Sequence, residues 1–144
     1  MRFTKLIAAG VALAGSVIGL IMTADHTKEE IKEMQDQRKA EETKWRGGQA
    51  GRFQAGLDAW KNTPGAVLID VREREDYEKD HIPGSIFQEL RTIDSTIETE
   101  VPDKSTPIFV YCYRGNRSRQ AEAILKEAGY ENVTNIGGIE WQKV

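Results

Sequence analysis

The sequence predicts an α/β fold with a mostly parallel sheet, because stretches typical of strands alternate with stretches typical of helices. Residues 66–71 (AVLIDV) form a nearly continuous apolar run, which is typical of a parallel strand covered on both faces. Residues 107–112 (PIFVYC) form a second run of this kind, and a helical pattern follows it. A last short strand over 133–136 continues the alternation, so helices are expected to connect parallel strands.

The composition is that of one soluble globular domain with an appendage. The chain has 144 residues, of which 39% are hydrophobic and 30% are charged. The formal net charge is −3, although Arg114 and Arg117 make one loop basic; this contrast argues against nucleic acid and favours a small anion. The single cysteine excludes an internal disulfide, a Cys-x-x-Cys redox pair and a cysteine-based zinc site. With only two histidines, far apart, we expect no metal site and no cofactor.

The N-terminus is predicted to be an export or membrane-insertion signal. Arg2 and Lys5 give a short basic start, and residues 6–24 then run without a charge. This length is about that of the shortest membrane spans and exceeds most signal-peptide cores, so a cleaved signal peptide stays open while an anchor is slightly favoured. The basic start is expected to stay in the cytoplasm, which places the rest in the periplasm or cell envelope. Residues 1–24 are therefore assigned as a signal peptide or transmembrane anchor.

Residues 25–50 are predicted to form a charged helical spacer. The apolar stripe of this helix is thin and consists of Ile31, Met34 and Trp45. Gly47 and Gly48 are expected to end the helix. A solvated spacer is favoured over a partner-binding helix, because little apolar surface is available to bury. The folded domain is assigned to residues 51–144.

The remaining elements of this domain follow in chain order. We expect a core-facing helical stripe of Phe53, Leu57 and Trp60, a charged helix over 73–80, a turn and short strand over 81–86, a loosely helical stretch over 91–101 and a helix over 117–128. The last of these helices is expected to bury Ala121, Ile124, Leu125 and Ala128, and Gly129 follows it as a C-terminal cap. Residues 137–141 (GGIEW) turn back toward the core.

The only cysteine, Cys112, lies between a predicted strand and a helix N-terminus, where a thiolate is most useful. The first backbone N–H groups of a helix lack intrahelical partners and favour an anion. Arg114 and Arg117 add positive charge that is expected to lower the pKa of the thiol, and Gly115 lets the loop amides point inward. The alternative, a small buried core residue, does not need a loop of this composition. Cys112 is therefore the predicted nucleophile.

Four motifs follow one another along the chain: Asp70-Val71-Arg72, 81–86 (HIPGSI), 112–118 (CYRGNRS) and 137–141 (GGIEW). Together they resemble the successive signatures of a single-domain rhodanese, a thiosulfate sulfurtransferase-like family. With an export segment in front, the chain most resembles the small periplasmic or envelope-anchored rhodaneses. The resemblance implies a rhodanese-like, mostly parallel five-stranded sheet flanked by helices. It also implies that a sulfane sulfur moves from thiosulfate or a persulfide to cyanide or a thiol through a persulfide on Cys112.

The resemblance also implies roles for residues around the cysteine. The implied substrate-binding loop is Tyr113, Arg114, Gly115, Asn116, Arg117 and Ser118. Its amides would stabilise the anionic persulfide, Arg117 would bind the donor's anionic end or brace the loop, and Arg114 would attract thiosulfate or stay a solvated charge. Asp70 and Arg72 are expected to support the loop, and His81 to stabilise a turn rather than act as a base. The expected partners are a small anionic sulfur donor and a thiol or cyanide acceptor, and no nucleic acid.

Two other functions stay open. Cysteine phosphatases and arsenate reductases of related fold have five residues between cysteine and arginine, whereas four lie between Cys112 and Arg117. A shorter loop makes a smaller cradle, which suits a sulfur atom better than a tetrahedral phosphate. A non-catalytic binding module in the envelope would use the 25–50 spacer to present the domain, but the intact cysteine loop argues for catalysis.

Overall fold

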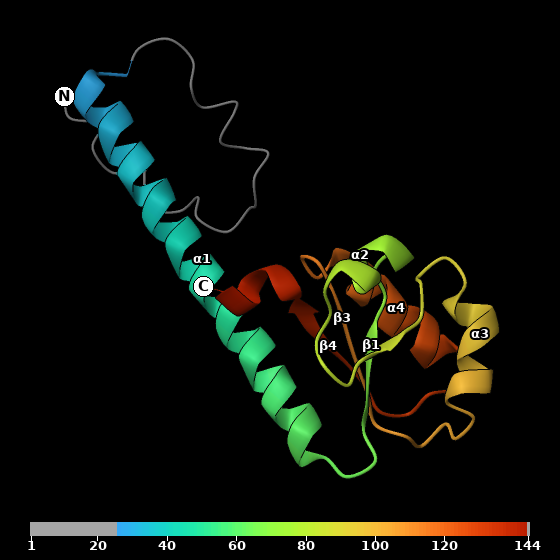
Figure 1. Cartoon of the computed structure of the whole chain (residues 1–144). Coiled ribbons are helices and arrows are strands. Elements are labelled where there is room, and N and C mark those ends of the chain that lie inside the picture. The colour runs from blue at the N-terminus through green and yellow to red at the C-terminus, as the bar shows by residue number, and fades with distance from the viewer. Residues whose placement is uncertain (1–25, 144) are drawn as a thin grey trace. The chain divides into compact units, whose positions relative to one another are not determined.

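The computed structural model describes residues 26–143 (Figure 1). Contacts divide the chain into two compact units, and the boundary between them follows Glu41. All strands of the sheet and the cysteine loop belong to the second unit. The apolar segment 6–24, with its predicted role in export, lies outside the described residues. Within 26–143, no helix has both the length and the apolar character that crossing a membrane requires.

Helix α1 (Lys28–Asn62) is longer than the sequence predicts. It begins with a capping box, in which the Glu30 amide donates to Thr27 Oγ1 at 3.3 Å and the Thr27 amide donates to Glu30 Oε2 at 2.8 Å. The helix continues through Gly47 and Gly48, so the expected break at these glycines is wrong. Each glycine costs a helix only about 1 kcal/mol relative to alanine, and helix formers on both sides offset that cost.

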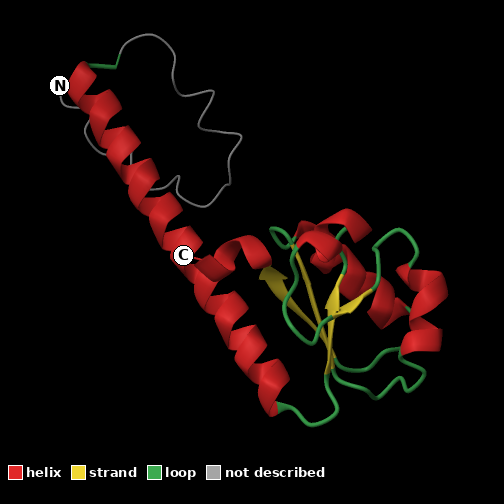
Figure 2. Cartoon of the chain, in the orientation of Figure 1, coloured by secondary structure: helices red, strands yellow, loops and turns green. Residues whose placement is uncertain are grey.

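Four parallel strands form the sheet within the described residues (Figure 2). They are β1 (Val67–Asp70), β2 (Ile86–Phe87), β3 (Ile108–Cys112) and β4 (Val133–Gly138), in the order β2-β1-β3-β4. The parallel sheet and its flanking helices confirm the predicted class, but the expectation of five strands is wrong for residues 26–143. The stretch directly before β1 is helical in α1, so it offers no further strand to the sheet.

Three short helices lie where the sequence pattern predicts them, and a 3-10 helix follows the last strand. They are α2 (Arg74–Lys79), α3 (Ile93–Glu100), α4 (Asn116–Glu127) and η1 (Ile139–Lys143). Gly129 has a φ of 97°, and its amide donates to the Lys126 carbonyl at 3.1 Å. The Tyr130 amide donates to the Leu125 carbonyl at the same distance of 3.1 Å. These two bonds satisfy the last carbonyls of α4 and confirm the predicted glycine cap.

Hydrophobic clusters cover both faces of the sheet, which explains why β1 and β3 are almost entirely apolar. On one face lie α3 and α4, through Ile93, Ile97, Ala121 and Leu125 (Figure 1). On the other face lies the C-terminal part of α1, through Phe53 and Leu57, which confirms the predicted core-facing stripe. Successive β3 side chains alternate between the two clusters, so Cys112 points to the face covered by α4.

Candidate active site

Cys112 is the last residue of β3, and a short turn separates it from α4. Its side chain is buried, with only 1% of its surface exposed. The backbone N–H of Gly115 donates to Cys112 Sγ at 3.0 Å, and the Ser118 hydroxyl oxygen lies 3.5 Å from Sγ. Ser118 Oγ also donates to the Gly137 carbonyl at 3.2 Å. The predicted nucleophile is therefore surrounded by polar groups from the loop, from α4 and, through Ser118, from β4.

The pKa of Cys112 lies below that of an ordinary thiol. Burial acts in the opposite direction and raises this pKa, because a thiolate loses solvation in the interior. Hydrogen bonds from the Ser118 side chain and from the amides of Ser118, Gly115 and Arg114 outweigh burial. The pKa is therefore lowered mainly by hydrogen bonds, as the sequence suggests for the loop and helix amides, and not by the charges of Arg114 and Arg117, which the sequence also suggests.

Gly115 gives the loop its inward curl. Its φ is 107°, in the left-handed region that residues with a side chain rarely adopt. It precedes the first residue of α4 as the N-cap, and this conformation turns its amide toward Cys112 Sγ. A Cβ at this position would also lie 3.4 Å from Gly137 Cα, so the loop and β4 pack closely. The geometry matches the curl expected from the sequence.

The segment that follows β4 holds the loop from its other side, which the motif alone did not reveal. The Glu140 amide donates to the Tyr113 carbonyl at 3.0 Å, and Trp141 Nε1 donates to the Arg114 carbonyl at 3.3 Å. Glu140 Oε2 lies 3.1 Å from Arg114 Nε and forms an ion pair with it. A Cβ on Gly138 would collide with the Tyr113 carbonyl. In the sequence, the only signal of this contact is the adjacent glycine pair of the GGIEW motif, because such glycines often mark a close approach of two backbones.

A small pocket lies beside the sulfur, and we call it the catalytic pocket. It has a volume of about 140 Å³ and is lined by Cys112, Tyr113, Arg114, Asn116 and Arg117. Arg117 is half-buried, and within residues 26–143 its side chain has no hydrogen-bond or ion-pair partner. Tyr113 is 45% exposed. The pocket gathers five of the predicted site residues, whereas Gly115 and Ser118 contact the sulfur itself.

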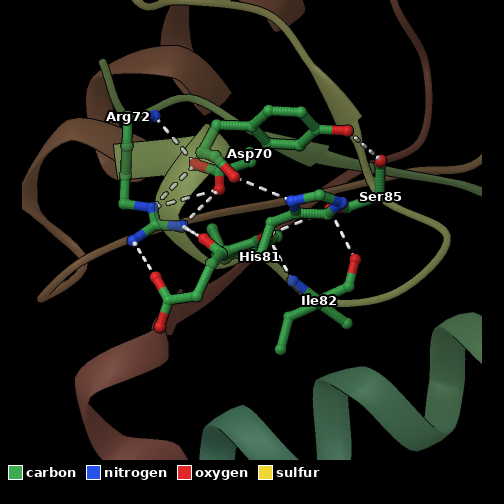
Figure 3. Close-up of polar contacts among 8 residues, drawn as sticks. Asp70, Arg72, His81, Ile82 and Ser85 are labelled. Atoms are coloured by element: carbon green, nitrogen blue, oxygen red, sulfur yellow. Dashed lines mark hydrogen bonds and ion pairs between the residues drawn. The ribbon is translucent and has the colours of Figure 1, made fainter. Parts of the chain in front are cut away.

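Asp70 and Arg72 form a buried ion pair at the end of β1 (Figure 3). Arg72 Nη2 lies 2.8 Å from Asp70 Oδ2, and Arg72 Nε lies 3.1 Å from Oδ1 and 3.0 Å from Oδ2. The Arg72 amide also donates to Asp70 Oδ1 at 2.9 Å, and Arg72 reaches the Asp80 carbonyl. Asp70 pairs with Tyr111 in the sheet register, one residue before the cysteine. The pair therefore fixes the strand end beside β3, and neither residue lines the catalytic pocket.

The 81–86 motif is a turn tied to β3 through Tyr111. The Tyr111 hydroxyl accepts a hydrogen bond from the Ile82 amide at 3.0 Å and lies 3.0 Å from Ser85 Oγ. Burial raises the pKa of Tyr111 far above its usual range, so this hydroxyl stays neutral. His81 Nδ1 lies 2.8 Å from the Tyr77 carbonyl, and the His81 ring stacks on the Tyr77 ring. These contacts are those of a turn-stabilising residue.

A cysteine of lowered pKa between a parallel strand and a helix N-terminus, with a loop amide donating to its sulfur, is an arrangement suited to nucleophilic chemistry on a small α/β fold. Among residues 26–143, no group of histidine, cysteine or acidic side chains is arranged to hold a metal ion. The rhodanese-like domain family matches residues 53–143, and the chain belongs to this family.

Named relatives and solved structures agree with this assignment. The thiosulfate sulfurtransferase PspE of Escherichia coli is 44% identical over 72 residues, which are 50% of this chain and 69% of that protein. The thiosulfate sulfurtransferase GlpE of Pseudomonas syringae is 39% identical over 74 residues, which are 51% of this chain and 68% of that protein. A structure described as a rhodanese with anions from E. coli is 43% identical and superimposes with a TM-score of 0.51, over 52% of this chain and 88% of that one. The family and these relatives support sulfurtransferase activity.

Proposed function

We propose that this protein is a thiosulfate sulfurtransferase that carries the transferred sulfur as a persulfide on Cys112. One observation carries the proposal: Cys112 lines a small pocket with two arginines and receives hydrogen bonds that favour its thiolate. The pocket volume of about 140 Å³ lies below the ~300 Å³ at which ordinary small-molecule sites begin. It therefore suits a donor of a few atoms, such as thiosulfate or the end of a persulfide.

In the first step the Cys112 thiolate attacks the outer sulfur of thiosulfate. A new S–S bond forms between Cys112 Sγ and that sulfur, the S–S bond within thiosulfate breaks, and sulfite leaves with the electron pair. Arg117 is the natural partner for the sulfonate oxygens, because it lines the pocket and is unpaired among the described residues. Arg114 is exposed at the same pocket and draws the dianion in by long-range attraction.

In the second step a nucleophile attacks the outer sulfur of the Cys112 persulfide. With cyanide the products are thiocyanate and the Cys112 thiolate; with a thiolate they are the acceptor's persulfide and the Cys112 thiolate. The loop amides that now favour the thiolate are also placed to stabilise the negative charge of the bound persulfide. The cycle is a ping-pong reaction, and the hydrogen bonds that lower the pKa of Cys112 favour the thiolate that it requires.

The geometry favours this chemistry over the two alternatives. A phosphatase needs a cradle for a tetrahedral phosphate, whereas four residues between Cys112 and Arg117 enclose a smaller pocket. A non-catalytic binding module has no need for a lowered cysteine pKa. Both alternatives give distinct results in the experiment below.

We also propose that residues 1–24 carry the domain to the periplasm or cell envelope. The support is the basic start at Arg2 and Lys5 followed by an uncharged stretch. Fractionation of cells that express the full chain, with mass spectrometry of its N-terminus, tests this. An intact, membrane-bound chain identifies an anchor and a shortened periplasmic chain identifies a signal peptide, whereas a cytoplasmic intact chain rejects the proposal.

The test of the enzymatic proposal is sulfur transfer by the full chain, purified in mild detergent, from thiosulfate to cyanide. We expect thiocyanate production that disappears in Cys112→Ala, and a mass increase of one sulfur atom when thiosulfate is added without cyanide. Cys112→Ala is checked by its thermal unfolding, so that loss of activity is separated from loss of fold. Release of phosphate from an aryl phosphate without sulfur transfer would identify a phosphatase. No turnover and no persulfide with either thiosulfate or a thiol persulfide would favour the binding module.

A further inference from the structure

A second pocket adjoins the catalytic pocket, and we call it the arginine pocket. It has a volume of about 330 Å³ and is lined by Trp45, Gln49, Arg52, Arg114, Gly115, Asn116, Arg119, Glu122, Asn135 and Gly137. Arg114 and Asn116 line both pockets, so the two lie side by side along the cysteine loop. The arginine pocket contains neither the cysteine nor Arg117. Its chemistry is therefore that of binding rather than of bond breaking.

The charge of the arginine pocket is positive, although the chain as a whole carries a formal charge of −3. Its only carboxylate, Glu122, already has both oxygens engaged: Oε2 accepts the Asn135 amide at 2.7 Å, and Oε1 lies 3.3 Å from Lys126 Nζ. Arg114 forms the ion pair with Glu140 described above, and the other two arginines are less engaged. Arg52 donates through Nη2 to the Asn135 carbonyl at 2.8 Å and forms no ion pair within 26–143. Arg119 has no hydrogen-bond or ion-pair partner for its side chain among the described residues.

The walls of the arginine pocket fit a small organic anion. A volume of about 330 Å³ is within the ordinary range for small-molecule sites, whereas the catalytic pocket is too small for more than a reacting end. Guanidinium groups bind carboxylates through paired hydrogen bonds, and Gln49, Asn116 and Asn135 offer amides for peptide-like groups. Trp45 is 54% exposed and adds an apolar wall.

We infer that the arginine pocket binds the carboxylate-bearing body of a small anionic thiol, which takes the sulfur from Cys112 in the second step. This inference rests on the proposed sulfur transfer. The thiol end enters the catalytic pocket while the carboxylates pair with Arg52 and Arg119, which holds the thiolate beside the persulfide. In the reaction the thiolate sulfur bonds to the outer persulfide sulfur, the Cys112 S–S bond breaks, and the electron pair returns to Cys112 as its thiolate. Cyanide and uncharged thiols gain nothing from this pocket.

Arg119→Gln tests the inference, because its guanidinium is exposed and unpartnered in the described part of the chain. With thiosulfate as donor, we expect the KM for glutathione to rise about three- to fivefold, as losing a partly exposed ion pair does. The kcat with glutathione, and the KM values for 2-mercaptoethanol and cyanide, stay unchanged. The matched control is Arg91→Gln, which removes an exposed arginine paired with Glu89 that lines neither pocket. Equal KM values for glutathione in wild type and Arg119→Gln would overturn the inference.

A binding measurement separates this inference from the proposed reaction. S-methylglutathione keeps both carboxylates but cannot accept sulfur, and its binding is followed by quenching of tryptophan fluorescence, since Trp45 lines the pocket. Binding that weakens in Arg119→Gln and not in Arg91→Gln supports the pocket even if the protein transfers no sulfur. Sulfur transfer to cyanide together with no binding of S-methylglutathione would leave the reaction standing and reject the pocket. Binding that is equally strong in both variants would also reject it.

Discussion

Ser118 is the side chain that lowers the pKa of Cys112, the predicted nucleophile, the most. Its oxygen lies 3.5 Å from Cys112 Sγ, and its single proton is shared between that sulfur and the Gly137 carbonyl. A thiolate is the better acceptor of the two because it is charged. The sequence pattern placed Ser118 in the loop, but the pattern could not tell a contact with the sulfur from an ordinary helix-start hydrogen bond.

We predict that Ser118→Ala raises the pKa of Cys112. The hydrogen bond from Ser118 lowers this pKa, so its removal shifts the pKa upward and reduces the thiolate fraction at pH 7. Alkylation by iodoacetamide at pH 7 should slow about tenfold, because a hydrogen bond to a charged group contributes ~1.5–3 kcal/mol. The rate is measured across pH, where the midpoint of the profile should move to higher pH.

Ser95→Ala is the control for this prediction, since its hydroxyl donates to the Thr92 carbonyl at the solvent-exposed start of α3. Its profile should match that of wild type. An unchanged profile in Ser118→Ala would mean that the backbone amides of Gly115, Ser118 and Arg114 suffice to hold the thiolate.

Among the elements, α1 is the one whose glycines have unequal roles. Gly56 packs against the Ile136 side chain of β4, and a Cβ there would collide with it. Gly47, Gly48 and Gly51 have open space around them. The sequence does not show which of these glycines are packed against another element. It therefore predicts a helix break at Gly47–Gly48 and assigns no packing role to Gly56. Only the packing of α1 on the sheet separates a tolerated glycine from a required one.

We predict that Gly56→Ala destabilises the domain by about 1–3 kcal/mol, as overpacking in a core does. This is opposite to the usual gain of alanine over glycine inside a helix, which is about 1 kcal/mol. Urea unfolding followed by circular dichroism measures the difference. Gly48→Ala is the matched control and should leave stability equal or higher. A stabilised Gly56→Ala would show that β4 yields easily to α1.

At the scale of the whole molecule, the cysteine loop is assembled from segments far apart in the chain. The strand, turn and helix around Cys112 are local, so the motif predicts them. The support from Trp141 and Glu140 reaches back to loop carbonyls that lie 27 residues earlier in the chain. Likewise, both-sided burial of β1 and β3 is readable from their apolar runs, whereas the number of strands depends on whether the stretch before β1 folds as helix.

We predict that Trp141→Phe lowers kcat/KM for thiosulfate and cyanide about three- to tenfold. Phenylalanine keeps the apolar ring but cannot donate to the Arg114 carbonyl, so the loop loses a hydrogen bond worth about 1 kcal/mol and its precise placement. Steady-state kinetics measure the change, and thermal unfolding should show a smaller effect. Trp60→Phe, a half-buried tryptophan that packs against Gly84, should keep full activity. Equal losses in both variants would indicate a general loss of packing instead.

The single cysteine of this chain has a consequence for the timing of the proposed cycle. Proteins with a second nearby thiol can discharge a persulfide internally, by closing a disulfide and releasing sulfide. Here Cys112 has no such partner, so the loaded sulfur can depart only to a molecule that arrives from outside. Under the proposed cycle, the lifetime of the loaded form is therefore set by the supply of acceptor, and the protein would hold sulfane sulfur whenever acceptors are scarce.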